Sequence, residues 1–318
     1  MSGSPQRVFI TGIAGCAGSH LAALAEARGA AVAGVDARTA PQTAANVRTG
    51  DIRSRALVDE AIKAFQPDWV FHLAALIPGP AATHAEDFVS VNVTGTLNVL
   101  EAVRAHVPAA RVLVASSSAI YGRPDDPDRP IDEDAPLRPQ SIYAVTKAAQ
   151  DMLAMQYATV HGLHVLTART FNQTGPREPD GLVCATIAAQ IARVEVKLQE
   201  PIVRTITLAP CRDFTDVRDV VAGYWAALEH GAPGGAYNVC SGQAVTIRRV
   251  ADVLQGLSRV PVEIVETGPP PPPQAILGQI GSFARLQQCS GWRPAISLEA
   301  SLAALLDERR SRVAAAST

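Results

Sequence analysis

Short apolar runs alternate with longer amphipathic segments along the first half of the chain. The runs rich in β-branched residues predict strands at 7–11, 31–36, 69–73, 111–116 and 165–169. The Ala-rich segments between them carry apolar positions at helical spacing and predict helices at 18–28, 54–65, 87–106 and 143–161. Parallel strands need such crossover helices, and the crossovers are right-handed in nearly all proteins. The pattern therefore predicts the α/β class, with a doubly wound parallel sheet covered by helices on both faces.

The pattern changes after Arg169. Polar loops follow, then a helix near 183–193 and short strands, yet segment 236–239 again has the character of a strand of the parallel sheet. We therefore predict two interleaved domains. The first comprises 1–168 plus about 212–243, and the smaller, substrate-binding one comprises 169–211 and 244–318. Five consecutive prolines at 269–273 fit neither a helix nor a sheet interior and predict a stiff extended loop.

Composition and charge narrow the classes of partner. The 318 residues are 47% hydrophobic and 18% charged, which is enough to bury one large core or two ordinary ones. Lys plus Arg number 28 against 30 Asp plus Glu, without a basic stripe, so nucleic acid is not expected as a partner. No apolar run approaches the ~20 residues that span a bilayer, and no signal peptide is recognisable, so we expect a cytoplasmic protein with no membrane partner. Five well-separated cysteines and scattered histidines predict neither disulfides nor a metal site.

A glycine-rich loop follows the first predicted strand and opens the first predicted helix. Gly12 permits a tight turn, Gly15 lets backbone N–H groups approach a phosphate, and Gly18 permits close packing of helix on strand. The helix N-terminus adds positive potential at the same place. The alternative is an ordinary turn, but an ordinary turn does not require three glycines at this spacing. We predict a Rossmann-type dinucleotide site formed by Gly12, Ile13, Ala14, Gly15, Cys16, Ala17 and Gly18.

Residues downstream of the loop bear on which dinucleotide is bound. Asp36 closes the second strand, where it can accept hydrogen bonds from the adenosine ribose and repel a 2′-phosphate, which favours NAD. Arg38 can instead bind a 2′-phosphate, so NADP stays open; the alternative for Arg38 is a solvated loop cation. Asp51 and Ile52 can hold the adenine, although Asp51 can equally cap the helix that begins near residue 54.

Tyr143 and Lys147 stand four residues apart at the start of a predicted helix, which places the phenol and the ammonium on one face. The ammonium, together with the positive nicotinamide ring of a bound cofactor, favours the phenolate and lowers the pKa of the phenol toward the range in which it exchanges a proton with a carbonyl or alcohol oxygen. Lys147 would also hold the nicotinamide ribose. The run Ser116-Ser117-Ser118 ends a strand at the same sheet edge, where one hydroxyl can hydrogen-bond the substrate oxygen. A plain surface helix is the alternative for the Tyr and Lys pair.

These motifs resemble the extended short-chain dehydrogenase/reductase family, whose members act largely on nucleotide sugars. The resemblance rests on the glycine loop, His72-Leu73-Ala74-Ala75, Asn92 to Thr96, Ser116 to Gly122, and Tyr143 with Lys147. It implies that Ser117, Tyr143 and Lys147 are catalytic. It also implies cofactor contacts for Leu73, Ala74, Ala75, Asn92, Tyr143, Lys147, Phe171 and Thr174. Finally, it implies a homodimer built from the helices that carry Asn92 and Tyr143.

Within that family the second half is most similar to the GDP-4-keto-6-deoxy-mannose reductases. The matching stretches are 169–176, 191–193 with 198–201, 212–219 and 237–242. They imply NAD(P)H-dependent reduction of a sugar ketone. The substrate contacts that we expect come from Ser118, Asn172, Arg212 and Arg218.

Two departures from the family pattern define the competing hypotheses. Dehydratases of the family carry an acidic residue just after the catalytic hydroxyl, where this chain has Ser118-Ala119, so dehydration is disfavoured. The proline run replaces a late Arg-Pro segment that clamps the sugar diphosphate. Our leading hypothesis is an NAD(P)-dependent oxidoreductase interconverting a ketone and a secondary alcohol in a small-molecule substrate. The alternatives are a dehydrogenase or ketoreductase acting on a non-nucleotide substrate of specialised metabolism, a nucleotide-sugar epimerase, and a redox-sensing binding protein without chemistry.

Overall fold

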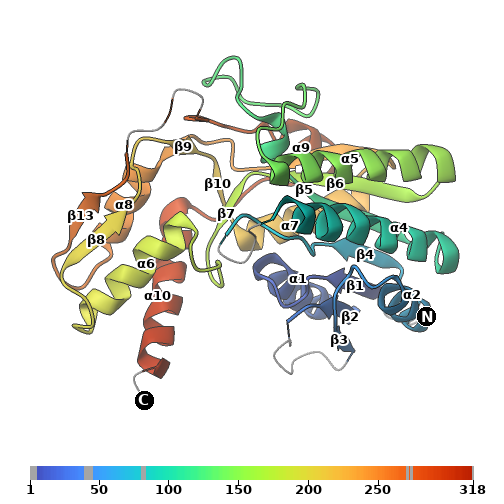
Figure 1. The fold of residues 1–318 in the computed structure, drawn as a ribbon, viewed down its shortest axis with the longest axis horizontal. Coiled ribbons are helices and arrows are strands. Elements are labelled where there is room, and N and C mark those ends of the chain that lie inside the picture. The colour runs from blue at the N-terminus through green and yellow to red at the C-terminus, as the bar shows by residue number, and fades with distance from the viewer. Residues whose placement is uncertain (1–5, 39–45, 80–83, 270–271, 273–274, 317–318) are drawn as a thin grey trace.

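A parallel sheet forms the centre of the molecule in the computed structural model (Figure 1). The structure describes residues 6–38, 46–79, 84–269, 272 and 275–316. Within them the sheet has seven strands: β1 (Arg7–Thr11), β2 (Ala31–Asp36), β3 (Val47–Thr49), β4 (Trp69–His72), β5 (Arg111–Ser117), β6 (His164–Thr170) and β11 (Ala236–Val239).

The strand order is β11-β6-β5-β4-β1-β2-β3, and every pair is parallel. The chain therefore begins in the middle of the sheet, builds outward through β2 and β3, and then returns to build outward through β4. Ligands of open α/β folds bind at the carboxyl edge beside this reversal, which here lies between β1 and β4. The predicted Rossmann-type doubly wound sheet is confirmed.

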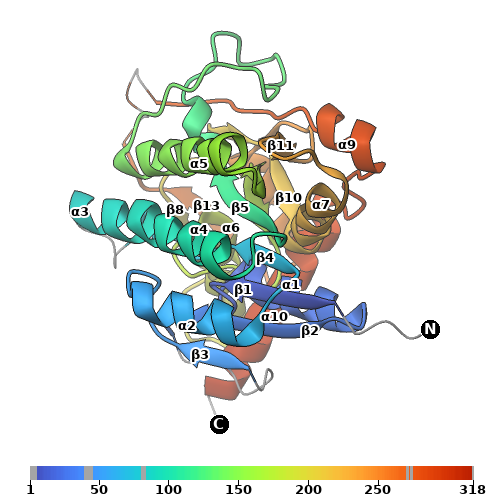
Figure 2. The same ribbon diagram turned by 90° about the vertical axis from the view of Figure 1, so that its right-hand side faces the viewer.

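Helices cover both faces of the sheet (Figure 2). One face carries α2 (Arg55–Phe65), α4 (Gly95–His106) and α5 (Ile142–His161), and the other carries α1 (Cys16–Ala27) and α7 (Val217–His230). A serine hydroxyl caps α5, because Ser141 Oγ accepts from Ala144 N. This cap fixes where α5 begins and so places Tyr143 in its first turn.

A second apolar core lies beside the sheet, at the left of Figure 1. It is formed mainly by α6 (Val183–Glu195), α8 (Ile247–Gly256) and α10 (Leu298–Ala316). The parallel pair β8 (Ile202–Thr205) and β13 (Glu263–Glu266) completes this layer.

Two short ladders run between this layer and the central sheet (Figure 1). They pair β7 (Asn172–Thr174) with β10 (Phe214–Asp216), and β9 (Cys211–Arg212) with β12 (Val245–Thr246). The chain thus crosses between the two layers several times.

Three features of the structure differ from those expected from the sequence or could not be compared with them. The predicted helix at 87–106 consists of α3 (Ala85–Phe88), a π-helical turn at Val89–Thr94 and α4. The edge strand β3 has only three residues, too few for an alternating pattern to reveal it. Of the proline run only Pro269 and Pro272 belong to the described residues, so the expected stiff loop lies outside them. In the described part of the chain, no helix combines the length and apolarity needed to cross a membrane.

Candidate active site

The glycine loop joins β1 to α1, and backbone atoms approach each other closely along it. Gly12 has φ +74°, and a Cβ there would lie 2.8 Å from Ala74 N. A Cβ on Gly18 would lie 2.1 Å from Gly12 O, and one on Gly15 would lie 3.0 Å from the same oxygen. Gly15 is also the N-cap of α1 and supplies no side chain to its first-turn N–H groups. The loop therefore fits the predicted cofactor site, with Gly12 and Gly18 required by local geometry and Gly15 in tight surroundings.

Asp36 and Arg38 are coupled at the end of β2. The Asp36 carboxylate is buried; its Oδ2 accepts from Ala14 N at 2.9 Å, and its Oδ1 accepts from Arg38 N at 2.9 Å and Arg38 Nε at 3.3 Å. The Arg38 side chain is 67% exposed, and a guanidinium nitrogen lies 3.6 Å from the position of a Cβ on Gly15. The ribose end of the site thus presents a carboxylate and a guanidinium together, which is compatible with either NAD or NADP.

Asp51 and Ile52 lie between β3 and α2. Asp51 pairs with Arg53 at 2.6 Å, and this contact lowers the pKa of the Asp51 carboxyl. The helix cap is Ser54, whose hydroxyl accepts from Leu57 N, so the alternative role of Asp51 as a cap is wrong. Ile52 is buried against the first residue of α4.

The segment that follows β4 runs directly beside the glycine loop. Leu73 N donates to Thr11 O at 3.1 Å, and Ala74 N donates to Thr11 Oγ1 at 3.2 Å. Asn92, in the π-helical turn, has all its side-chain polar atoms engaged by the protein. Its Oδ1 accepts from Leu76 N at 2.7 Å, and its Nδ2 donates to Leu76 O and to Thr146 Oγ1. In this arrangement Asn92 anchors the chain beyond residues 73–75.

The three predicted catalytic residues meet at the carboxyl end of β5. Ser117 is its last residue, and its hydroxyl hydrogen-bonds the Tyr143 phenol and accepts from Ala119 N at 3.2 Å. Lys147, one turn along α5, is buried and donates from Nζ to Ala115 O at 2.8 Å. The structure therefore brings Ser117 and Tyr143 into contact. It holds Lys147 Nζ at the carbonyl of Ala115, which lies two residues before Ser117 on β5.

Burial sets the protonation states of this group. It lowers the pKa of Lys147 to about 7, with Asp151 acting in the opposite sense. It also raises the pKa of Tyr143, and the hydrogen bond from Ser117 offsets only part of that rise. The expected acidification of the phenol is therefore not produced by the protein groups alone, because desolvation of the phenolate outweighs them. Tyr143 is a protonated acid at neutral pH, the form that can give a proton to a carbonyl oxygen.

The segment after β6 reaches across to the first turn of α1. Pro176 O accepts from His20 Nε2 at 3.0 Å and lies 3.6 Å from Cys16 Sγ. Phe171 and Thr174 are buried on the way, whereas Asn172 is exposed. Residues 171–176 therefore adjoin the glycine loop from the side of the second layer.

Glu178 is a buried carboxyl at this junction. It is 2% exposed, and its Oε2 accepts from Thr174 Oγ1 at 2.7 Å. Burial raises its pKa from 4.5 to about 7. The folded-state pKa exceeds the unfolded one, so the stability that protonation contributes is fully present below about pH 4.5 and is lost as the pH rises to 7.

We expect Glu178→Gln to be more stable than the parent at about pH 8 by on the order of 2–3 kcal/mol, and nearly equal to it at about pH 4.5. The reason is that glutamine keeps the oxygen that accepts from Thr174 but carries no charge into the buried site. Denaturant unfolding at the two pH values measures the difference, with the exposed Glu263→Gln as control. An equal effect of Glu178→Gln at both pH values contradicts this assignment.

The two predicted substrate arginines have different surroundings. Arg218 forms a two-bond pair with buried Asp216, both bonds at 2.8 Å, so its guanidinium is already engaged by the protein. Arg212 is half-buried, and its Nη1 donates to Cys211 O at 2.8 Å. Burial lowers the pKa of Arg212, and it forms no ion pair with a carboxylate of the described residues. Of the two, Arg212 is the better candidate for an anionic ligand.

Gln279 is a residue of this region that sequence reasoning missed. It is buried, and its Nε2 donates to Ser118 O at 3.1 Å and to Gly122 O at 2.9 Å. It thereby ties the segment after the proline run to the residue that follows Ser117. The sequence shows Gly278-Gln279 where the family pattern has Gly-Asp, but it does not predict these contacts, because the partners are backbone carbonyls more than 150 residues away.

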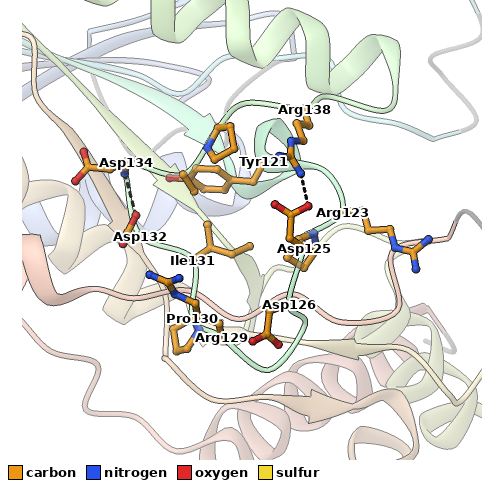
Figure 3. A pocket seen from close by; sticks show the side chains of 13 residues that line it. Tyr121, Arg123, Asp125, Asp126, Arg129, Pro130, Ile131, Asp132, Asp134 and Arg138 are labelled. Carbon is orange, nitrogen blue, oxygen red and sulfur yellow. Dashed lines mark hydrogen bonds and ion pairs between the residues drawn. The ribbon is translucent and has the colours of Figure 1, made fainter.

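A pocket of about 390 Å³ lies in the loop that connects Ser117 to Tyr143 (Figure 3). Tyr121 and Ile131 form its apolar floor, and charged side chains surround them, among them Arg138 paired with Asp125 at 2.5 Å. The loop adjoins the segment of Gln279, since Gly278 faces Pro127.

Comparison with known proteins now gives these groups a context. A model of the NAD dependent epimerase/dehydratase family matches residues 8–240, which include the glycine loop, Ser117, Tyr143 and Lys147. The chain belongs to this family. It is an NAD(P)-dependent enzyme of the extended short-chain dehydrogenase/reductase type, as its motifs predicted.

Members of the family that act on different sugars resemble the chain over nearly its whole length. It is 35% identical to the GDP-6-deoxy-D-mannose reductase of Pseudomonas aeruginosa over 97% of this chain and 98% of the relative. It is 30% identical to the UDP-glucose 4-epimerase of Azospirillum brasilense, over 91% and 87% of the two chains.

Solved structures of family members support the same relationship. The structure of RMD from Pseudomonas aeruginosa complexed with NADPH matches with a TM-score of 0.85 and 34% identity, over 96% of this chain and 99% of that one. The UDP-glucose 4-epimerase of Thermus thermophilus in complex with NAD matches with a TM-score of 0.83 and 29% identity, over 96% and 99%. Both forms of the cofactor thus occur among similar family members.

Proposed function

We propose that this family member interconverts a ketone and a secondary alcohol in a nucleotide sugar, with a GDP-4-keto-6-deoxy sugar as the leading substrate. The observation that supports the reaction is the contact between Ser117 and protonated Tyr143, with the buried Lys147 amine held on the same strand end at Ala115 O. The similarity to a GDP-6-deoxy-D-mannose reductase over almost the whole chain supports the substrate class.

Tyr143 is the proton donor in the direction of reduction. Its phenol is protonated at neutral pH and gives its proton to the carbonyl oxygen, while Ser117 hydrogen-bonds that oxygen as negative charge develops on it. The hydride for the carbonyl carbon would come from a reduced nicotinamide, were one bound at the glycine loop. In the direction of oxidation Tyr143 must first lose its proton, and the phenolate oxygen then takes the proton from the alcohol.

Lys147 can supply positive charge near this exchange, although burial lowers its pKa to about 7, so the protein alone holds it only partly charged at neutral pH. Its Nζ carries three donors when charged, and Ala115 O accepts one of them. The remaining donors can bind a ribose hydroxyl of the cofactor, and the charge stabilises the phenolate that forms when Tyr143 releases its proton. Residues 12–18, 36–38 and 73–75 would hold the rest of the cofactor.

The proposal is tested by comparing substrates. Purified enzyme is supplied with NADPH or NADH and either a GDP-4-keto-6-deoxy sugar or uncharged ketones of similar size. We expect kcat/KM for the GDP sugar to exceed that for the uncharged ketones by at least a hundredfold, since the diphosphate contributes charge-assisted hydrogen bonds. Equal or better turnover of an uncharged ketone rejects the substrate class and favours the alternative of a non-nucleotide substrate.

Arg212 is the residue through which we expect the diphosphate to act. Arg212→Met should raise KM for the GDP sugar roughly ten- to a hundredfold and leave kcat within about twofold, because one charged hydrogen-bond donor is lost far from the reacting carbon. Steady-state kinetics measures both constants, with Arg48→Met at the opposite edge of the sheet as control. An unchanged KM assigns the anion site elsewhere.

The alternative of a non-nucleotide substrate has one observation in its favour. The family's late Arg-Pro segment is replaced by prolines, and Arg218, which could compensate, is held by Asp216. Of the two predicted arginines, only Arg212 is then available to bind an anion, and such a site favours a substrate with less negative charge. The substrate comparison above distinguishes the two cases.

We further propose that the enzyme is a homodimer. Helices α4 and α5 and the turn before α4 leave large apolar side chains exposed on one side of the molecule: Val89, Leu97, Val145, Met152 and Met155. Met152 is 65% exposed, and Val145, two turns earlier on the same face of α5, is 46% exposed. Neighbouring exposed apolar side chains of this kind mark an interaction surface. A second copy of the same face can cover both helices in a symmetric contact.

Met152→Lys combined with Met155→Lys should convert a protein with the mass of two chains into one with the mass of a single chain. The charged side chains would have to be buried in the dimer contact without partners. Light scattering coupled to size exclusion measures the mass, and Ile206→Lys, exposed on the other layer, serves as control. A parent protein that elutes as a monomer contradicts the proposed dimer.

A further inference from the structure

A continuous path of buried hydrogen bonds connects the end of β1 with α4. Thr11, His72 and Thr96 are each at most 1% exposed. Thr11 Oγ1 lies 2.7 Å from His72 Nδ1, and His72 Nε2 lies 2.8 Å from Thr96 Oγ1. Gln150, on α5, also reaches Thr96 Oγ1, at 2.5 Å. The imidazole thus bridges the strand that precedes the glycine loop and the layer of helices that carries the catalytic pair.

The contacts of Thr96 favour one position for the imidazole proton, because the 2.8 Å contact of His72 Nε2 with Thr96 Oγ1 is much shorter than the 3.5 Å that separates His72 Nε2 from Gln150 Nε2. The Thr96 hydroxyl donates its one hydrogen to Asn92 O at 2.5 Å. Its oxygen can then only accept, both from Gln150 Nε2 and from His72 Nε2. His72 therefore carries its proton on Nε2 and leaves Nδ1 bare, as an acceptor for the Thr11 hydroxyl. Thr11 in turn accepts from Ala74 N.

Every bond in this path points in the same direction. Ala74 N–H donates to Thr11, Thr11 to His72, His72 to Thr96, and Thr96 to the Asn92 carbonyl. Hydrogen bonds aligned in this way polarise and strengthen one another in a buried environment. A charged imidazole or the other tautomer would break at least one of them.

Asn92 extends the path to the catalytic tyrosine. Its side chain donates to Thr146 Oγ1 at 3.0 Å, and Thr146 Oγ1 donates to Tyr143 O at 2.8 Å. The backbone carbonyl of Tyr143 is thereby connected, through Asn92 and His72, to Thr11, the neighbour of Gly12. Gln150, three residues after Lys147, gives a second connection from α5 to the same point at Thr96.

We propose that His72 is a positioning residue whose neutral Nε2–H form fixes the first turns of α5, and with them Tyr143 and Lys147, relative to the glycine loop. The inference rests on the proposed function, in which the phenol and the cofactor must be held together. Burial and the nearby Lys147 lower the pKa of His72 to about 3, so the ring is neutral at neutral pH. A displacement of about 1 Å between reacting groups costs roughly a hundredfold in rate.

The first test separates positioning from folding. His72→Leu removes both hydrogen bonds, and His72→Gln keeps an amide N–H at the distance of Nε2. We expect His72→Leu to lower kcat roughly a hundredfold with KM and the cofactor Kd changed less than threefold, and His72→Gln to recover at least tenfold of that loss. Tyr157→Phe, which removes a hydrogen bond to Glu101 at the far end of α5, should leave kcat unchanged.

Three outcomes overturn the proposal: an unchanged kcat in His72→Leu, an equal loss in the Leu and Gln variants, or a loss confined to KM. If His72→Leu does not fold, nitrogen-15 spectra of the imidazole in the parent protein decide the matter. The proposal requires a protonated Nε2 and a bare Nδ1 at neutral pH, and a charged ring or the opposite tautomer refutes it. These spectra do not depend on turnover, so a failure of the proposed reaction is recognised separately, by full activity in Tyr143→Phe.

Discussion

Tyr143→Phe is expected to lower kcat by roughly two to four orders of magnitude while the cofactor Kd changes less than twofold. The substitution removes only the phenol oxygen, which we assign as the donor of the proton to the substrate oxygen, and such proton transfer typically contributes this much to the rate. The aromatic ring remains to pack edge-on against Phe88, whose ring centre lies 6.4 Å away. Single-turnover kinetics with reduced cofactor measures the chemical step, and fluorescence titration measures the Kd.

Tyr157→Phe is the matched control, because it removes a buried phenol oxygen from the same helix at a distance from the site. Its kcat should equal that of the parent. Retention of more than about a tenth of the activity in Tyr143→Phe would show that another group supplies the proton. Ser117 is the nearest such group, and the double variant would then identify it.

Gly18→Ala is expected to weaken cofactor binding ten- to a hundredfold or more and to lower the stability of the protein. Its Cβ would lie 2.1 Å from Gly12 O and 2.8 Å from Ile13 Cα, both of them backbone atoms that no rotamer change can move aside. Forcing an atom into packed surroundings typically costs ~1–3 kcal/mol, and ~1.4 kcal/mol corresponds to a tenfold change in affinity. Calorimetric titration with NADPH and thermal unfolding measure the two effects.

The sign of the change in stability on Gly18→Ala distinguishes a crowded site from an open one. Alanine normally favours a helix over glycine by about 1 kcal/mol, so an open helical site should gain stability. Gly256→Ala on α8, where no heavy atom lies within 4 Å of the new Cβ, is the control and should be neutral or stabilising. A Gly18→Ala protein that binds cofactor like the parent would contradict the close approach of α1 to the loop.

The sequence pattern predicted those parts of the site that depend on short segments. The glycine loop, the end of β2 at Asp36 and the four-residue spacing of Tyr143 and Lys147 are all local features. Their meeting at one sheet edge follows from the parallel topology, since the carboxyl ends of β1, β2, β4 and β5 lie on the same side.

Features that depend on contacts between distant segments were not predictable in this way. The pairing of Arg218 with Asp216, the bonds of Gln279 to the residues after Ser117, and the path through His72 all require the folded arrangement. The protonation state of Tyr143 is the clearest case. The spacing to Lys147 and a bound nicotinamide together suggest a phenolate, whereas burial, which the spacing does not reveal, raises the pKa of the phenol in the protein without cofactor.

Transfer of deuterium from the cofactor tests the proposed redox chemistry most directly. The enzyme is supplied with NADPH that carries deuterium at nicotinamide C4 and with the GDP-4-keto-6-deoxy sugar, and the product is examined by mass spectrometry. The account predicts an alcohol with one deuterium on the carbinol carbon for each cofactor oxidised. Recovery of the unreduced ketone, with no deuterium incorporated and no cofactor oxidised, would contradict it.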